Sequence, residues 1–281
     1  MVKMDGLIKN YGDFRLDISL EIPDGTVTGI VGKNGAGKST TIKAILGLIK
    51  PDAGRVTING QDASSLRGPE KASLGVALSD SGFSSYLRVE DVICILRKTY
   101  PEFDEEFFRA CCISQRLPFD RQIKEFSTGM RAKLRVLCAI SHKAKLLIMD
   151  EPTAGLDVEA RNDILDLLRQ YLADNDDRSI LLTSHISSDL ENLCDDIYLI
   201  HDGRIVLHED TDTILSDYAI LKVSEEAYEN LDKSYILSAK KEHFGYACFT
   251  NQKMFYAENY PGIVIENGRI DDLILMMTGG K

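Results

Sequence analysis

Residues 32–39 read GKNGAGKS, a full match to the pattern G-x-x-x-x-G-K-[ST]. The apolar segment 27–31 (VTGIV) precedes this stretch, and a helix-like run from Ser39 to Leu48 follows it. Glycines let a backbone turn with positive φ and bring its N–H groups close to a phosphate chain, and the start of a helix adds a partial positive charge. The stretch therefore predicts a phosphate-binding loop between a strand and a helix. A glycine-rich turn that matches by chance is the alternative, which the flanking segments disfavour.

Two side chains of this loop have specific expected roles. Lys38 is expected to place its ammonium between the β- and γ-phosphates, and the Ser39 hydroxyl is expected to ligate Mg²⁺. The residues expected to contact the nucleotide are Gly32, Lys33, Asn34, Gly35, Ala36, Gly37, Lys38, Ser39 and Thr40.

Asp150 and Glu151 follow the apolar run 146–149 (LLIM), which is typical of a parallel strand buried on both faces. In such sheets ligands lie beyond the carboxyl ends of the strands, so both carboxylates are expected beside the phosphate-binding loop. Asp150 would bind Mg²⁺ through its hydration shell, and Glu151 would orient or deprotonate the attacking water. The alternative is a surface acidic pair at the end of a strand.

Two further residues have open interpretations. His185 follows the apolar strand candidate 180–183; a lone histidine is usually structural, but one at this edge of the sheet can hydrogen-bond a γ-phosphate. Tyr11 precedes Gly12 near the N-terminus, where it could stack on an adenine ring or be an ordinary half-exposed strand tyrosine, and spacing alone does not separate these two roles.

The rest of the pattern predicts the organisation of the chain. A chain of 281 residues suits one large domain, or one domain with a small appendage. Residues 1–31 predict short strands, and helical patterns broken by Pro101 and Pro118 over about 80–126 predict a helical insertion in an α/β sheet. From about residue 212 onward, short mixed segments predict a small α+β appendage.

Composition excludes several classes of protein. The net charge of −11 argues against broad nucleic-acid binding, because phosphate contacts need clustered Lys and Arg. The six cysteines show no C-x-x-C spacing, which favours reduced thiols over metal ligands. No apolar run approaches the length of a membrane span, and the N-terminus lacks an apolar signal core.

The order of these motifs resembles the ATPase subunit of ATP-binding-cassette (ABC) transporters over roughly residues 2–210. The most specific part is the signature 126–130 (FSTGM), about 20 residues before the acidic pair, which other phosphate-loop ATPases lack. Residues 154–157 (AGLD) are similar to the family's D-loop, and residues 183–185 (TSH) to its switch histidine. Tyr11 falls where the family places its adenine-stacking aromatic.

The resemblance implies an α/β fold, a P-loop NTPase with a mixed β-sheet core, an N-terminal antiparallel β part, a helical subdomain and a small α+β C-terminal appendage. The ATPase domain would span residues 1–211, with the helical subdomain of about 80–126 inserted, and a small accessory region would span 212–281. ATP and Mg²⁺ are the implied cofactors, and Lys38, Glu151 and His185 the implied catalytic residues.

The same resemblance implies a mechanism with two chains. Ser127, Gly129 and Asp157 would contact the nucleotide held by a second subunit, in either a homodimer or a heterodimer. The partner would be a transmembrane permease on a separate chain, which places this chain in the cytoplasm, peripheral on the inner face of the membrane. The long tail is similar to that of the bacterial drug- and bacitracin-export type, so export is the expected direction.

Two other functions remain open at this point. One is a soluble ABC-type ATPase acting on nucleic acid or ribosomes, although those relatives usually carry a coiled-coil insert or two cassettes. The other is a phosphate-loop kinase, which would need neither the signature nor His185.

Two positions depart from the family pattern. The family usually has a glutamine where this chain has Ser79, and serine is too short for the same contact with Mg²⁺ and water. The neighbouring Asp80 could replace the glutamine by acting through a water. In the signature, Thr128 replaces a glycine and Met130 a glutamine. Ser127 and Gly129, the phosphate-facing positions, are retained.

Overall fold

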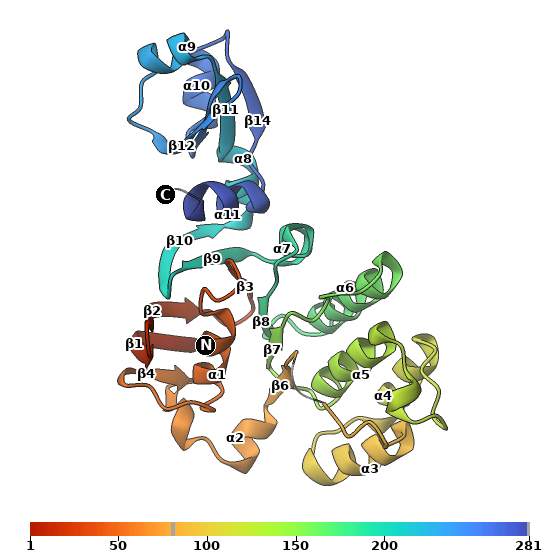
Figure 1. Ribbon diagram of the computed structural model, residues 1–281. Coiled ribbons are helices and arrows are strands. Elements are labelled where there is room, and N and C mark those ends of the chain that lie inside the picture. Colours follow the sequence, from red (N-terminus) through yellow and green to blue (C-terminus); the bar gives the residue numbers. More distant parts are fainter. Residues whose placement is uncertain (80–81, 280–281) are drawn as a thin grey trace.

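Three sheets and the helices packed on them make up residues 1–79 and 82–279, the part of the chain that the computed structural model describes (Figure 1). The first sheet is antiparallel, with strand order β2-β1-β4-β5. Its strands are β1 (Val2–Tyr11), β2 (Phe14–Ile22), β4 (Ala53–Ile58) and β5 (Gln61–Asp62). The predicted N-terminal antiparallel part is confirmed, and its alternating apolar residues, such as Ile18 and Ile22, are buried.

The second sheet is mixed, as predicted, with strand order β10-β9-β3-β8-β7-β6. Its strands are β3 (Val27–Val31), β6 (Leu74–Ala77), β7 (Leu146–Asp150), β8 (Ser179–Thr183), β9 (Asp196–His201) and β10 (Arg204–Asp210). All neighbouring strands are parallel except β9 and β10. The carboxyl ends of β3, β6, β7 and β8 therefore meet at one edge, where ligands of such sheets bind.

The helix after the phosphate-binding loop, α1 (Lys38–Ile45), packs between the first two sheets. It ends three residues before the predicted run does. Gly47 takes the left-handed conformation (φ 63°), and its N–H and that of Leu48 bond to the carbonyls of Ala44 and Lys43. This Schellman arrangement stops the helix, because only glycine adopts that conformation without strain.

Helices cover the other face of the mixed sheet. These are α5 (Thr128–Ile140), α6 (Val158–Ala173) and α7 (Ser187–Leu193). The expected helical insertion between β6 and β7 is present, and it adds α3 (Val89–Thr99) and α4 (Glu105–Ser114) beside α5, at the lower right of Figure 1. A short helix, α2 (Gly68–Ala72), precedes β6. Buried Ile93 and Phe108 join these helices to the main apolar core.

The third sheet lies at the top of Figure 1 and has strand order β12-β13-β11-β14. Its strands are β11 (Ala219–Val223), β12 (Ile236–Glu242), β13 (Gly245–Thr250) and β14 (Val264–Asn267). The helices of this region are α8 (Thr211–Asp217), α9 (Glu225–Asn230), α10 (Lys253–Asn259) and α11 (Ile270–Thr278). The sheet has a small core of its own, which includes Leu221 and Tyr256. A domain boundary at 211/212 stays a prediction.

Among the helices of residues 1–79 and 82–279, none has the length and apolar composition that crossing a membrane requires. All six cysteines are free thiols, as expected from their spacing.

Thiol reactivity should follow burial. Burial raises the pKa of Cys112 to about 12 and that of Cys248 to about 11, so at pH 8 almost none of either thiol is the reactive thiolate. Cys94, on the exposed side of α3, should therefore react with iodoacetamide first, and Cys112 and Cys248 only after denaturant is added. Peptide mass spectrometry measures this order. Equally fast labelling of Cys112 and Cys94 would contradict the packing of α4.

Candidate active site

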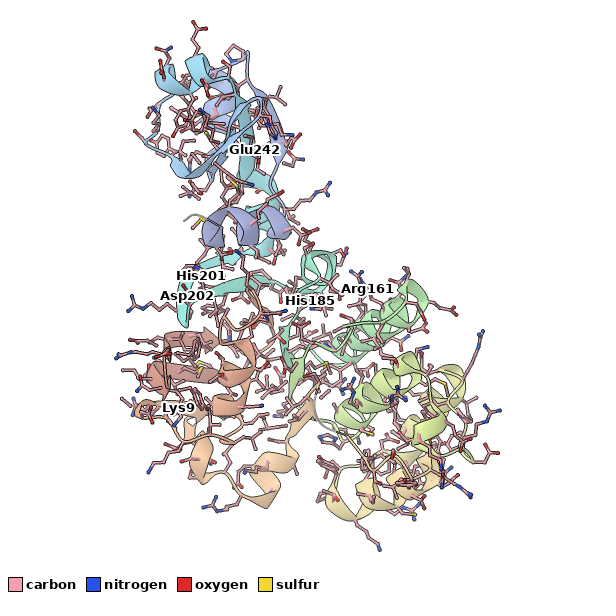
Figure 2. The ribbon with its side chains drawn as sticks, in the orientation of Figure 1. Lys9, Arg161, His185, His201, Asp202 and Glu242 are labelled. Carbon is pink, nitrogen blue, oxygen red and sulfur yellow. The ribbon has the colours of Figure 1, made fainter. Side chains whose placement is uncertain are left out.

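The loops after four parallel strands line one open hollow of about 470 Å³. Its lining residues are Phe14, Asn34, Gly35, Gly37, Lys38, Ser39, Thr40, Ser79, Asp150, Glu151, Ala154 and His185. The structure thus brings the phosphate-binding loop, the acidic pair and the histidine together, as expected from the place of each at the carboxyl end of a strand. Figure 2 shows His185 between the N-terminal strands and α6.

The phosphate-binding loop is held by tight backbone packing. Gly32 has φ 152°, and a Cβ at this position would lie 2.2 Å from the carbonyl oxygen of Ile200, so only glycine fits. The buried ammonium of Lys38 donates to the carbonyl of Gly32 at 2.7 Å. Its nitrogen also lies 3.9 Å from Oε1 of Glu151. A cation is therefore fixed where the phosphates are expected.

Asp150 is surrounded by hydroxyl groups. Thr183 Oγ1 donates to its Oδ1 at 2.6 Å, and Ser39 Oγ to the same oxygen at 3.4 Å. Ser79 Oγ donates to Oδ2 at 3.3 Å. Carboxylate and hydroxyl oxygens suit Mg²⁺, which usually takes few protein ligands and keeps waters and phosphate oxygens. The described ranges, 1–79 and 82–279, contain no group of three or more His, Cys, Asp or Glu that could hold a metal alone. The donor set fits a metal ion shared with a nucleotide.

Thr183 is a residue that the sequence analysis gave no role of its own. Besides its bond to Asp150, its hydroxyl and its carbonyl accept hydrogen bonds from the N–H of Glu151, at 3.0 and 3.1 Å. It is fully buried. The sequence signal for this role is that Thr183 is a hydroxyl residue at the end of an apolar strand candidate. Thr183 therefore positions the carboxylate of Asp150 and the main chain of Glu151.

Glu151 adopts an uncommon backbone conformation, with φ 52°. Such conformations cluster at functional sites, where surrounding contacts maintain them. Nδ1 of His185 lies 2.5 Å from Oε2 of Glu151. Because a carboxylate only accepts hydrogen bonds, Nδ1 carries the proton in this contact. The Glu151 carboxylate is thus oriented between Lys38 and His185.

The segment after β6 is fixed by Arg135 of α5. One guanidinium nitrogen donates to the carbonyls of Leu78 and Ser79, at 3.0 Å each. Burial, followed by the nearby charge of Arg131, lowers the pKa of Arg135. Ser79 therefore contacts Asp150 through its hydroxyl and α5 through its carbonyl, a link that the sequence did not reveal. Asp80 lies outside the described residues.

The three residues predicted to contact a nucleotide held by a second subunit do not line the hollow of their own chain. Ser127 caps α5 by accepting the N–H of Met130 at 3.1 Å, and Asp157 caps α6 by accepting the N–H of Ala160 at 2.8 Å. A Cβ at Gly129 would lie 2.9 Å from that of Ala160, so a glycine there also allows α5 and α6 to approach. Contact of these residues with a nucleotide stays a prediction.

The aromatic residue that lines the hollow is Phe14, whereas the predicted adenine-stacking residue, Tyr11, lies outside it. Tyr11 is 47% exposed at the end of β1 and is not among the lining residues. Its antiparallel partner across the hairpin, Phe14, does line the hollow. A Cβ at Gly37 would lie 3.2 Å from Cζ of the Phe14 ring, so this ring lies beside the phosphate-binding loop. The short hairpin spacing was the signal for Phe14 that the sequence analysis missed. Stacking of Tyr11 on adenine stays a prediction.

This prediction has a direct test. If Tyr11 stacks on the base, Tyr11→Ala should weaken ATP binding about fivefold, since an aromatic pair contributes about 0.5–1.5 kcal/mol, and Tyr11→Phe should bind as the parent does. Fluorescence titration of each variant measures the affinity. Unchanged binding by Tyr11→Ala, together with weaker binding by Phe14→Ala, would assign the base to Phe14 instead.

Several known proteins are similar to this chain in sequence. The family described as "ABC transporter" matches residues 16–154. The ABC transporter ATP-binding protein YtrB of Bacillus subtilis (strain 168) is 28% identical over 215 residues, 76% of this chain and 73% of the relative. NatA, an ABC transporter ATP-binding protein of the same organism, is 31% identical over 196 residues, 68% and 79% of the two chains. The Nod factor export ATP-binding protein I of Rhizobium sp. (strain N33) is 28% identical over 233 residues, 80% and 75%.

A solved structure agrees with the sequence comparisons. The structure of an ATP binding subunit of an ABC transporter superposes with a TM-score of 0.68 at 27% identity. The similarity covers 76% of this chain and 91% of that one.

Proposed function

The chain belongs to the ATP-binding proteins of ABC transporters and is an ATPase of that family, and from this premise we propose that it drives export through a separate transmembrane permease. The observation that carries the proposal is the convergence of Lys38, Asp150, Glu151 and His185 on one hollow. The relative named for Nod factor export supports the direction of transport. The chain would act at the inner face of the membrane.

The reaction proposed is in-line attack of water on the γ-phosphorus of ATP. A bond forms from the water oxygen to phosphorus, the bond to the β-phosphate oxygen breaks, and ADP leaves. Glu151 orients the water and takes its proton, while His185 holds the carboxylate in place. Lys38 stabilises the negative charge that develops on the phosphates. Mg²⁺, when held by Ser39 and Asp150, would supply further stabilisation of this negative charge.

A second copy of this chain, or a related chain, would complete the site. Ser127 and Asp157 are exposed, and each caps the start of a helix. The N–H groups at the start of α5, including that of Gly129, suit the γ-phosphate of a nucleotide bound to the partner. ATP would then hold two subunits together, and hydrolysis would release them.

Phosphate release separates this function from its two alternatives. The purified chain should release phosphate from ATP without any acceptor, whereas a kinase would need a small-molecule acceptor. If a multi-helix membrane protein is encoded beside this chain, adding it in purified form, in detergent or vesicles, should change the rate of release. The Glu151→Gln chain is the matched control for contaminating ATPases. Stimulation by RNA, DNA or ribosomes in place of the membrane protein would support the soluble alternative.

A further inference from the structure

The last helix, α11, follows the third sheet in the sequence but packs on the ATPase core. It lies between the third sheet and β9–β10 (Figure 1). Ile270 and Leu273 have no exposed surface and share the apolar core of Leu190 in α7. Polar contacts reinforce this packing, since Glu191 Oε1 accepts the N–H of Ile270 at 3.2 Å. The start of α11 is thus fastened to α7.

A second polar contact joins these helices closer to the active site. Ser187 Oγ donates to Oδ2 of Asp271 at 2.8 Å. Ser187 is the first residue of α7 and lies two positions after His185. The turn that carries His185 is therefore held between β8 and a helix that α11 contacts.

The other end of α11 contacts the phosphate-binding loop itself. Nζ of Lys33 donates to the carbonyl oxygen of Thr278 at 2.9 Å. Carbonyls of a last helical turn have no partner within the helix, and this end carries a partial negative charge, so an ammonium is a suitable partner. Lys33 does not line the hollow, whereas its neighbour Asn34 does. The Lys33 side chain is therefore committed to α11 rather than to the phosphates.

The backbone of Lys33 also shapes the loop. Its carbonyl accepts the N–H of Ala36 at 3.1 Å and the ammonium of Lys38 at 3.3 Å. One residue thus fixes the loop turn with its main chain and contacts α11 with its side chain. A loop that is already fixed loses less conformational freedom when it binds a ligand.

We propose that α11 is a positioning element of the nucleotide site, and that docking of α11 and binding of nucleotide favour each other. The proposal rests on the proposed function only in requiring that the loop binds nucleotide. Coupling between two sites is reciprocal. A bound nucleotide therefore holds α11 against the core, and a contact on the third sheet that moves α11 weakens the hold on nucleotide.

The first test measures both directions of this coupling in the full chain, with Mg²⁺ and ADP as the probe so that no hydrolysis occurs. In the parent, Mg²⁺ and ADP should slow hydrogen exchange of amides in 270–278. Lys33→Met should abolish that protection and raise the Kd for ADP about fivefold, which corresponds to about 1 kcal/mol for one hydrogen bond. Lys33→Arg keeps a donor and should restore both. Lys50→Met, at the exposed end of the segment after α1, is the control for loss of charge.

The second test separates α11 from a direct effect of the Lys33 charge. Leu273→Ala loosens α11 without altering the loop, and it should also raise the Kd for ADP. Because both variants act through the docking of α11, adding Lys33→Met to Leu273→Ala should change the Kd less than twofold further. If Leu273→Ala does not fold, as thermal unfolding would show, the pair Ser187→Ala and Glu191→Gln replaces it.

Two results would overturn the proposal: fully additive effects on the Kd, or exchange of α11 that does not respond to ADP in a parent chain that binds it. A parent chain that binds no nucleotide at all would instead refute the proposed function, so the two failures are distinguishable.

Discussion

Lys38→Ala should lose about 10- to 150-fold in ATP affinity. The buried ammonium is fixed 2.7 Å from the Gly32 carbonyl, so it is available to the phosphates at little further cost in ordering. A charge-assisted contact of this kind contributes about 1.5–3 kcal/mol, which corresponds to the stated factor. The variant also leaves Glu151 without its nearby cation. Isothermal titration calorimetry with ATP measures the loss.

The matched control for this variant is Lys50→Ala, which removes an exposed lysine beyond α1. Its affinity for ATP should equal that of the parent. If Lys38→Ala bound ATP as tightly as the control, the loop would not be part of the nucleotide site. The hollow that the loop lines would then not be the ATP-binding site either.

Glu151→Gln should reduce the rate of ATP hydrolysis at least about 100-fold, because a general base typically contributes a factor of about 10²–10⁴. The amide has nearly the shape of the carboxylate but does not take a proton from water. ATP should still bind, since Lys38 and the loop are unchanged. The nucleotide-bound dimer should then persist and elute early in gel filtration with ATP, and as a monomer without it.

Glu229→Gln in α9, on the third sheet and exposed, serves as the control for this charge change. It should hydrolyse ATP at the parent rate. Parent-like hydrolysis by Glu151→Gln would exclude Glu151 from the mechanism. Loss of hydrolysis with no ATP-dependent dimer would keep the base but contradict the shared site, in which Ser127 of one subunit faces the loop of another.

Site residues that belong to short sequence motifs were predictable from the sequence. The loop 32–39, the acidic pair after β7 and the histidine after β8 each carry a short-range signal, and one edge of a parallel sheet collects them. The helical insertion and the strands after residue 212 also follow from periodicity and turn residues. Thr183 and Arg135 were missed, since their roles depend on neighbours that are distant in the sequence. Phe14 was missed although it pairs with Tyr11 across a short hairpin.

Short motifs indicate which chemistry this chain carries, because phosphate recognition depends on residue types at fixed short spacings. The support of that chemistry depends on contacts between segments that are distant in the sequence. Thr183 holds the carboxylate of Asp150 and the main chain of Glu151, and Arg135 holds the carbonyl of Ser79. The carbonyl of Thr278 meets Lys33 across 245 positions of sequence. Contacts at such separation arise from burial of apolar faces such as that of α11, and no short-range pattern specifies the partner of a buried face.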